Sequence, residues 1–172
     1  MSEAEHCYLV ALGSNVRHVR YGLPRKVLAA AFGRLDKGGA ALIAASGIMT
    51  SAPLGPSRRT YANAAALVTS RLPPPGMLLH LQQIEREFGR ARRGQRWGAR
   101  TLDLDIVLWS GGVWCDDTVI IPHPEFRQRD FVLRPAAQIA PQMRDPLSGL
   151  SVRQHLFRLH KPKALDPRHA PA

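Results

Sequence analysis

Two aspartates, one residue apart, carry the clearest chemical signal in this chain of 172 residues. Asp103 and Asp105 belong to residues 102–109, LDLDIVLW, where apolar and acidic types alternate as in a β-strand. Because strand side chains alternate between two faces, both carboxylates are expected on one face, with Cα atoms about 6.5–7 Å apart. Mg²⁺ is commonly held by one or two carboxylates together with substrate phosphates. Such a pair by itself is more often two solvated surface aspartates. The neighbouring residues therefore decide whether a metal site is the better interpretation.

A run of basic residues directly precedes the acidic pair. Glycines interrupt this run, which predicts a loop rather than a helix face. Arginines beside a metal-binding pair suit phosphoryl transfer, because the metal neutralises some phosphate oxygens and guanidinium groups bind the others. A solvated basic loop, or one that binds a nucleic acid backbone, is the alternative. The arginines of residues 86–100 are Arg86, Arg90, Arg92, Arg93, Arg96 and Arg100.

A helix is expected before this run, from the proline triplet at residues 73–75 to the stop at Gly89. On a helical projection Glu85 falls inside the apolar arc, and Gln82 falls at its edge. A carboxylate on a buried face costs free energy unless it is paired. A role in a binding site and an internal ion pair with an arginine explain Glu85 equally well. The apolar arc consists of Met77, Leu78, Leu81, Ile84 and Phe88.

A third segment, residues 121–131 with the sequence IPHPEFRQRDF, gathers further polar and aromatic groups. His123 can donate a hydrogen bond to phosphate, and an aromatic ring such as Phe131 can stack on a planar ligand. The neighbouring Arg127 and Arg129 add positive charge. By itself the segment is also consistent with structural roles.

The remaining patterns predict the elements that must position these groups. Strands are expected at residues 8–12, 41–49, 61–70, 102–109, 113–115 and 119–121, and a last helix at residues 152–160. Residues 131–139 show no single period. On the strand 102–109, one face is expected to carry Leu102, Leu104, Ile106 and Leu108. An early helix is expected from the spacing of Val19, Leu23, Val27, Ala30 or Ala31, and Leu35. Interleaved strands and helices in this length predict one domain of the α/β or α+β class.

Composition narrows the function classes. No apolar stretch approaches the ~20 residues of a membrane helix, and the start resembles no secretory signal. Only two cysteines, Cys7 and Cys115, are present, which excludes a disulfide framework and fits a reducing cytoplasm. The net charge of +11 calls for an anionic partner: a nucleic acid, an anionic membrane or a phosphorylated small molecule.

Taken together, the segments resemble the 6-hydroxymethyl-7,8-dihydropterin pyrophosphokinase (HPPK) family. RWGARTLDLDIVL at residues 96–108 is similar to the signature of that family. Four other landmarks follow the family order: ALGSN, a Pro-Leu-Gly loop before aromatic-x-Asn, Gln-x-x-Glu, and PHPEFRQRDF. The resemblance spans about residues 8–146. It implies a single-domain α+β fold, a ferredoxin-like sandwich with helices packed on a mainly antiparallel sheet. Residues 1–160 would form this domain, and residues 161–172 a flexible tail.

The resemblance also implies a reaction. HPPK enzymes transfer pyrophosphate from ATP to the hydroxymethyl group of 6-hydroxymethyl-7,8-dihydropterin and release AMP, in folate biosynthesis. Two Mg²⁺ ions and ATP as co-substrate are implied, in the cytoplasm. The partners would be small molecules, with no nucleic acid and no membrane. We expect a monomer, with a dimer as the alternative.

The family pattern assigns site residues by position. Metal binding falls to Asp103 and Asp105, and catalysis to these two with Arg90 and Arg100. The ATP side comprises Gln82, Glu85, Arg92, Arg96, Ile106, His123 and Arg129. The pterin side comprises Ser51, Pro53, Leu54, Tyr61, Asn63, Trp97 and Phe131. Tyr61 and Phe131 would enclose the flat pterin, while Asn63 reads its donor and acceptor edge and Trp97 covers it.

Two other functions are alternatives on the residues alone. A different Mg²⁺-dependent phosphoryl or nucleotidyl transferase would use the same acidic pair. A nucleic-acid-binding domain would use the positive charge, but two adjacent carboxylates repel a phosphate backbone unless a metal intervenes. The sequence also contains no recognisable nucleic-acid-binding module.

Overall fold

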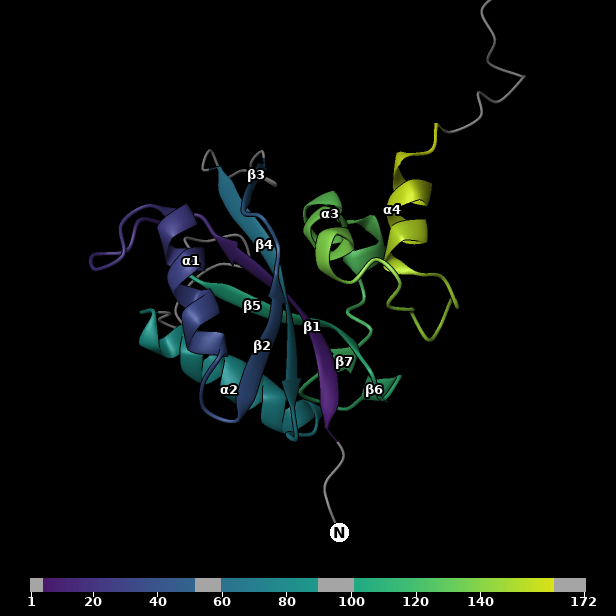
Figure 1. Ribbon diagram of the computed structural model, residues 1–172, viewed down its shortest axis with the longest axis horizontal. Helices are drawn as coiled ribbons and strands as arrows, with labels where there is room; N and C mark the ends of the chain where they lie inside the picture. Colours follow the sequence, from purple (N-terminus) through teal and green to yellow (C-terminus); the bar gives the residue numbers. More distant parts are fainter. Residues whose placement is uncertain (1–4, 52–59, 90–100, 163–172) are drawn as a thin grey trace, which may run out of the picture.

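The computed structural model describes residues 5–51, 60–89 and 101–162, and its centre is an antiparallel sheet of five strands in the order β2-β4-β1-β5, with β3 also paired to β4 (Figure 1). The strands are β1 (His6–Ser14), β2 (Ala40–Ala45), β3 (Met49–Ser51), β4 (Tyr61–Ser70) and β5 (Asp103–Trp109). A small second sheet joins β6 (Trp114–Cys115) and β7 (Ile120–Ile121). The helices are α1 (Pro24–Leu35), α2 (Pro74–Glu87), the 3₁₀ turn η1 (Phe126–Gln128), α3 (Asp130–Ile139) and α4 (Val152–His160). This is the α+β sandwich that the sequence predicts.

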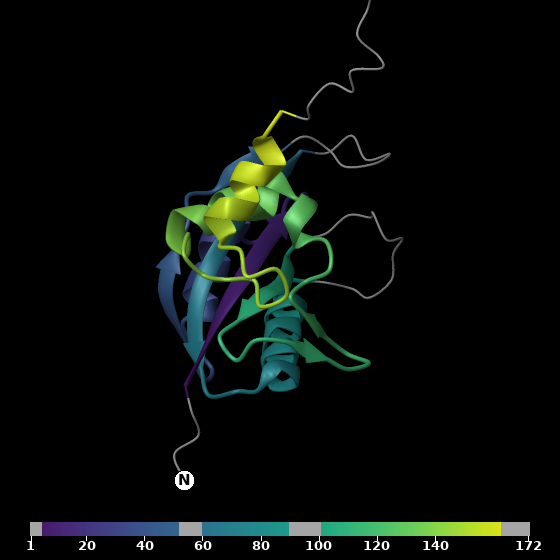
Figure 2. The same ribbon diagram turned by 90° about the vertical axis from the view of Figure 1, so that its right-hand side faces the viewer.

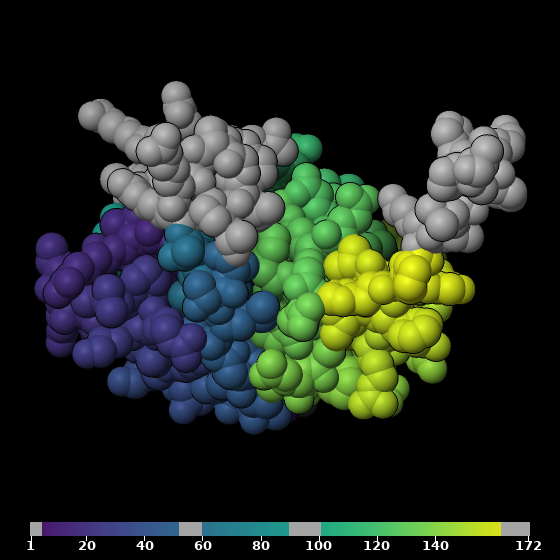
Figure 3. Space-filling view, turned by 90° about the horizontal axis from the view of Figure 1, so that it is seen from above, coloured from purple at the N-terminus to yellow at the C-terminus, as the bar shows by residue number. Residues whose placement is uncertain are grey.

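The helices form layers on the two faces of the sheet. Helices α1 and α2 cover one face, α3 covers the other, and α4 packs against α3 (Figure 1). Figure 2, seen from the side of α4, shows this helix in front of the strands. Figure 3 shows the same order from above, from α1 in purple through the blue strands to α3 in green and α4 in yellow. Among the described residues, no helix has the length and apolar character needed to cross a membrane.

The middle of strand β1, residues 8–12, is apolar, and its side chains pack into the cores on both faces of the sheet. Tyr8, Val10 and Leu12 belong to the core under α1 and α2, whereas Leu9 belongs to the core under α3. The Tyr8 hydroxyl donates to the Leu72 carbonyl over 2.6 Å, and burial raises the pKa of Tyr8 to about 12. The phenol therefore stays neutral and serves packing.

The first helix, α1, begins later in the chain than the apolar spacing predicted. Pro24 occupies the first turn, where proline is favoured, and Leu23 before it is extended. Residues 18 and 22 pair in a tight turn, so Val19 projects fully into solvent. The assignment of Val19 and Leu23 to the helix was wrong, because they matched the helical period by chance within a turn.

The strand predicted at residues 41–49 divides into β2 and β3. Ser46 lies between them, and its hydroxyl accepts the Ala65 N–H over 2.8 Å. The next N–H, that of Gly47, donates to Oε1 of Gln138 in α3 over 2.9 Å and not to β4. Asp36 at the end of α1 also binds this region, because its carboxylate accepts the Leu42 N–H of β2 over 2.8 Å.

A β-bulge changes the expected faces of β5. Leu9 pairs with Leu108 while Val10 pairs with Ile106, so Val107 is an extra residue on β5. Leu102, Leu104 and Ile106 therefore lie under α1 and α2 as predicted, but Leu108 lies in the core under α3. The prediction for Leu108 was wrong because the bulge reverses the alternation beyond it. Residues 131–139, whose pattern was mixed, form α3 around the buried Pro135.

The turn after β5 depends on a residue without a side chain. A methyl group at Gly111 would lie 2.3 Å from the indole of Trp109. That indole packs with the rings of His6 and Trp114, at centroid distances of 5.2 and 5.9 Å. The ring can therefore move only by giving up aromatic contacts.

We predict that Gly111→Ala lowers the free energy of unfolding by about 1–3 kcal/mol, as overpacking does. Gly33→Ala is the matched control, since no atom beyond the neighbouring residues and backbone of α1 lies within 4 Å of the added methyl. Helix propensity predicts that this control is neutral or stabilising by up to about 1 kcal/mol. Thermal unfolding followed by circular dichroism compares the two, and a Gly111→Ala melting temperature at or above the wild-type value would contradict the packing argument.

Candidate active site

A cavity of about 710 Å³ lies where β1 ends and β4 and β5 begin, on the face of the sheet that α3 covers. Strands supply its floor, and the segment that leads into α3 supplies a wall. Its lining is formed by Ala11, Leu12, Gly13, Ser51, Tyr61, Asn63, Asp103, Asp105, His123, Glu125, Gln128, Arg129, Phe131 and Val132. Candidate residues from four separate parts of the sequence thus meet in one place.

The register of the strands aligns the polar residues of the floor. Gly13 on β1 pairs with Asn63 on β4 and with Asp103 on β5, so these three lie in one row across the sheet. One step along the same face, Ala11 pairs with Asp105. Both carboxylates line the cavity from one face of β5, as their spacing predicted.

The opposite end of the cavity presents an amide and two aromatic rings. Asn63 is nearly fully buried, and its Nδ2 donates to Ser51 Oγ over 2.7 Å, which orients the amide. Tyr61, paired with Ser51 in the ladder, lines the cavity from β4. Phe131 lines it from α3, with the Arg129 guanidinium carbon 5.9 Å from its ring centroid.

His123 is presented to the cavity as a neutral donor. Its backbone N–H donates to the Val107 carbonyl over 3.0 Å, and its Nδ1 accepts the Glu125 N–H over 3.2 Å. Burial lowers the pKa of His123; the carboxylates of Asp105, Glu125 and Asp103 oppose this, and the Arg129 charge reinforces it. With Nδ1 accepting, the proton of the neutral ring sits on Nε2.

The two aspartates suit a magnesium ion that also binds phosphate. In the parts of the chain that the structure describes, no group of three or more His, Cys, Asp or Glu side chains could hold a metal alone. Two carboxylates leave most positions around Mg²⁺ to water and phosphate oxygens, which is the usual arrangement at phosphoryl-transfer sites. Asp103 and Asp105 fit this arrangement because they face an open cavity side by side.

Comparisons with known proteins agree with this geometry. The family model described as 7,8-dihydro-6-hydroxymethylpterin-pyrophosphokinase (HPPK) matches residues 9–141. The chain belongs to the HPPK family. A 2-amino-4-hydroxy-6-hydroxymethyldihydropteridine pyrophosphokinase of Haemophilus influenzae is 37% identical over 163 residues, which cover 92% of this chain and 97% of that relative. Its counterpart in Pseudomonas aeruginosa is 40% identical over 141 residues, covering 80% and 82%.

Other similar proteins are longer than the shared part. The alignment with the counterpart from Synechocystis, 40% identical over 104 residues, covers 60% of this chain and 53% of that relative. Among solved structures, Plasmodium falciparum HPPK-DHPS has a TM-score of 0.70 at 11% identity, over 91% of this chain and 45% of that chain. An HPPK-DHPS structure in complex with substrates gives 0.70 at 12% identity, over 90% and 43%. These structures support the fold, and the chain spans less than half of their length.

Three residues that the HPPK pattern assigns to the ATP side do not line the cavity. Ile106 lies in the core under α1 and α2. Gln82 is half-buried on α2. Glu85 is almost fully buried, and its Oε1 accepts the Leu104 N–H over 2.8 Å. Since Leu104 separates the two aspartates, Glu85 holds β5 at the point where both carboxylates are presented.

Other assigned residues lie outside the described residues: Pro53, Leu54, Arg90, Arg92, Arg96, Trp97 and Arg100. Of the arginine run, the structure describes Arg86, which donates to Gln83 Oε1 over 2.7 Å on the exposed side of α2.

The HPPK pattern as read from the sequence omitted several lining residues. Glu125 pairs with Arg129, and Gln128 lies between them in the sequence; the polar character of PHPEFRQR was the available signal. Gly13 was quoted only as part of ALGSN. A Cβ there would lie 3.7 Å from Asn63 Oδ1, so alanine fits but a larger side chain would fill the cavity. Its importance follows from strand pairing, which the motif does not encode.

We predict that Glu85→Leu lowers the free energy of unfolding by about 1–3 kcal/mol, because it leaves the buried Leu104 N–H without its acceptor. Glu85→Gln keeps an oxygen acceptor and serves as the matched control. Hydrogen exchange of the Leu104 amide, followed by NMR, should accelerate in the leucine variant and stay slow in the glutamine variant. Equal protection in both variants would show that the bond does not hold β5.

Proposed function

We propose that the cavity is the active site for the reaction of the HPPK family, the transfer of pyrophosphate from ATP to the hydroxymethyl group of hydroxymethyldihydropterin in folate biosynthesis. The observation that carries this proposal is the shared floor, which aligns the Asp103 carboxylate with the Asn63 amide across the row centred on Gly13. A site for metal-bound phosphates and a site for a flat heterocycle are thereby placed next to each other. This adjacency is what transfer between the two substrates requires.

The pterin would occupy the end of the cavity near β3 and β4. Tyr61 and Phe131 come from opposite layers, strand and helix, and both line the cavity, so a flat ring between them contacts two aromatic faces. Asn63, oriented by Ser51, offers one donor and one acceptor to the edge of the ring. Pro53, Leu54 and Trp97 are proposed to complete this end.

The phosphates of ATP would occupy the end near β5. Two Mg²⁺ ions held by Asp103 and Asp105 would neutralise phosphate charge and orient the chain of phosphates. His123 donates from Nε2 and Arg129 contributes positive charge beside them. Arg90 and Arg100 are proposed to bind the phosphates in the transition state, with Arg92 and Arg96 closing over ATP. Gln82, Glu85 and Ile106 support this side from behind β5, where the structure places Glu85 and Ile106 in the interior.

The reaction itself needs little covalent help from the protein. The pterin hydroxyl attacks the middle phosphorus of ATP, the bond to the α-phosphate oxygen breaks, and AMP leaves. Positioning and stabilisation of developing charge account for most of the catalysis in such transfers. The lining accordingly offers carboxylates, an imidazole and a guanidinium rather than a nucleophilic cysteine.

We place the enzyme in the cytoplasm as a monomer. Cys7 and Cys115 are free thiols, which fits a reducing compartment. The cavity floor and wall described above are formed by one chain, as a monomeric enzyme requires. The positive charge of the chain serves to bind small anionic substrates and not a nucleic acid.

We predict that ATP, 6-hydroxymethyl-7,8-dihydropterin and Mg²⁺ incubated with this protein yield AMP and the pterin pyrophosphate, with no ADP. Separation of the nucleotides by ion-exchange chromatography measures this directly. Formation of ADP would show transfer of a single phosphoryl group and contradict the proposal.

Asp103→Asn and Asp105→Asn should each lower turnover by at least about 100-fold, because they remove charge that binds metal at the reacting phosphates. Asp117→Asn, the same change at an exposed position on the turn between β6 and β7, is the matched control and should leave turnover unchanged. Activity of the first two variants close to the wild-type level would refute the metal assignment.

A further inference from the structure

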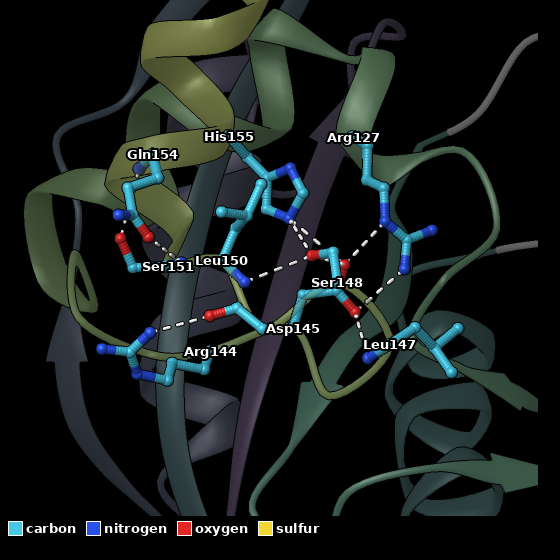
Figure 4. A network of polar contacts seen from close by, with 10 residues as sticks. Arg127, Arg144, Asp145, Leu147, Ser148, Leu150, Ser151, Gln154 and His155 are labelled. Carbon is cyan, nitrogen blue, oxygen red and sulfur yellow. Dashed lines mark hydrogen bonds and ion pairs between the residues drawn. The ribbon is translucent and has the colours of Figure 1, made fainter.

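A fully buried carboxylate lies in the loop between α3 and α4, where it binds the turn η1 (Figure 4). Asp145 is 0% exposed. The guanidinium of Arg127 binds it through two bonds, from Nε to Oδ2 over 2.7 Å and from Nη2 to Oδ1 over 2.9 Å. Such paired bonds fix the orientation of an arginine as well as its distance.

Further donors complete the shell around Asp145. Ser148 Oγ donates to Oδ2 over 2.6 Å, and the Leu147 N–H donates to Oδ1 over 3.0 Å. Burial by itself would raise the pKa of Asp145, but the bonds from Arg127, Ser148 and Leu147 outweigh it and hold this pKa well below its usual range. The carboxylate is therefore charged at neutral pH, and its charge is matched by Arg127.

Ser148 and His155 next to Asp145 do not form a hydrolytic triad. His155 Nε2 lies 3.0 Å from Ser148 Oγ and 3.2 Å from Asp145 Oδ2, so one nitrogen faces both groups. A triad needs the serine and the carboxylate on different ring nitrogens. Ser148 also donates its proton to Asp145 and not to the histidine. The cluster therefore has a structural role and contains no activated nucleophile.

What the cluster holds is the wall of the cavity. Arg127 belongs to η1, and the residues directly after it, Gln128 and Arg129, line the cavity. Phe126 in the same turn is buried against the ring of His155, at a centroid distance of 5.4 Å. The turn is therefore fixed on one side by Phe126 and Arg127, and it presents its other side to the cavity.

Backbone bonds carry this placement into α3. The Arg129 N–H donates to the Phe126 carbonyl over 3.2 Å, and the Arg129 carbonyl accepts the Val132 N–H over 3.0 Å at the start of α3. Phe131, in the first turn of α3, follows Arg129 by two residues. A shift of η1 would consequently move a proposed phosphate-binding group and a proposed pterin-binding ring together.

We propose that Asp145 is a positioning residue for substrate binding, which acts through Arg127 to set where Arg129 and Phe131 stand in the cavity. This inference rests on the proposed function for the identity of the substrates. Asp145 itself contacts neither substrate, because it is enclosed by Arg127, Ser148, Leu147 and His155.

The test compares Arg127→Lys with the same change in an arginine–carboxylate pair of equal fork geometry on the other face of the sheet. Arg34 binds Glu87 with the same fork, over 2.6 and 2.9 Å, and the Arg34 side chain is 28% exposed against 29% for Arg127. Lysine keeps the charge at either position and loses the fork. Arg34→Lys thus controls for the loss of the fork itself, with an acceptor that is 35% exposed where Asp145 is buried.

We expect Arg127→Lys to raise the KM values for ATP and the pterin about tenfold with kcat within about twofold, because binding is lost equally in ground and transition states. Asp145→Asn should do the same, and Arg34→Lys should leave both KM values unchanged. Unchanged KM values in Arg127→Lys would overturn the proposal, as would equal shifts in Arg34→Lys. If Asp145→Asn does not fold, Arg127→Lys decides alone.

A second readout separates this proposal from the proposed function. Exchange of the Gln128 and Arg129 amides, followed by NMR without substrates, should accelerate in Arg127→Lys and not in Arg34→Lys. Failure of the wild-type protein to release AMP would refute the function, whereas unchanged exchange at these amides would refute the positioning role by itself.

Discussion

Repulsion between two neighbouring carboxylates is the constraint on which the rest of this structure depends. Asp103 and Asp105 lie on one face of one strand, so they can be accommodated only where cations and solvent reach them. The cavity provides that access, with His123 and Arg129 on its wall. Behind the pair, the strand is held by the protein interior: the opposite face of β5 is core, and the Leu104 N–H between the two aspartates donates to Glu85.

The sheet permits this arrangement because helices cover its two faces to different extents. One face is covered by α1 and α2, which contact β1, β2, β4 and β5. The other is packed by α3 over only part of its length, and the uncovered end is the cavity floor. The small residues Ala11 and Gly13 of β1 leave space for the cavity, whereas the neighbouring strands β4 and β5 supply its functional groups. A single antiparallel register then brings the metal-binding and ring-binding groups into the same row.

The sequence predicted those elements whose signal is local. Strand 61–70 and helix 152–160 have the predicted bounds in the structure, as β4 and α4, because each is delimited by its own pattern and by residues such as Ser151, which caps α4. Two of the errors arose where distant contacts decide. Gly47 leaves the ladder because Gln138, 91 residues away, binds its N–H, and Leu108 changes face because β1 imposes a bulge. Neither event leaves a mark on the local pattern.

The site divides in the same way. The spacing of Asp103 and Asp105 predicted their shared face, and the helical projection predicted the burial of Glu85, since both are properties of one element. The convergence of Asn63, Gly13 and Asp103 requires the pairing of three strands, so only the family resemblance suggested that these segments act together. No sequence pattern pointed to Asp145, because its role depends on its ion pair with Arg127, 18 residues away.

Carboxylates from neighbouring segments also occupy both outer edges of the main sheet. At one edge Asp36 takes the Leu42 N–H of β2, and at the other Glu85 takes the Leu104 N–H of β5, each over 2.8 Å. An open edge with free N–H groups invites another chain to add a strand, which is a common route to aggregation. Each of these two strands is therefore closed to such pairing at one of its N–H groups. At β5 the bond that supports the metal-binding pair also removes one N–H group from pairing with a further strand.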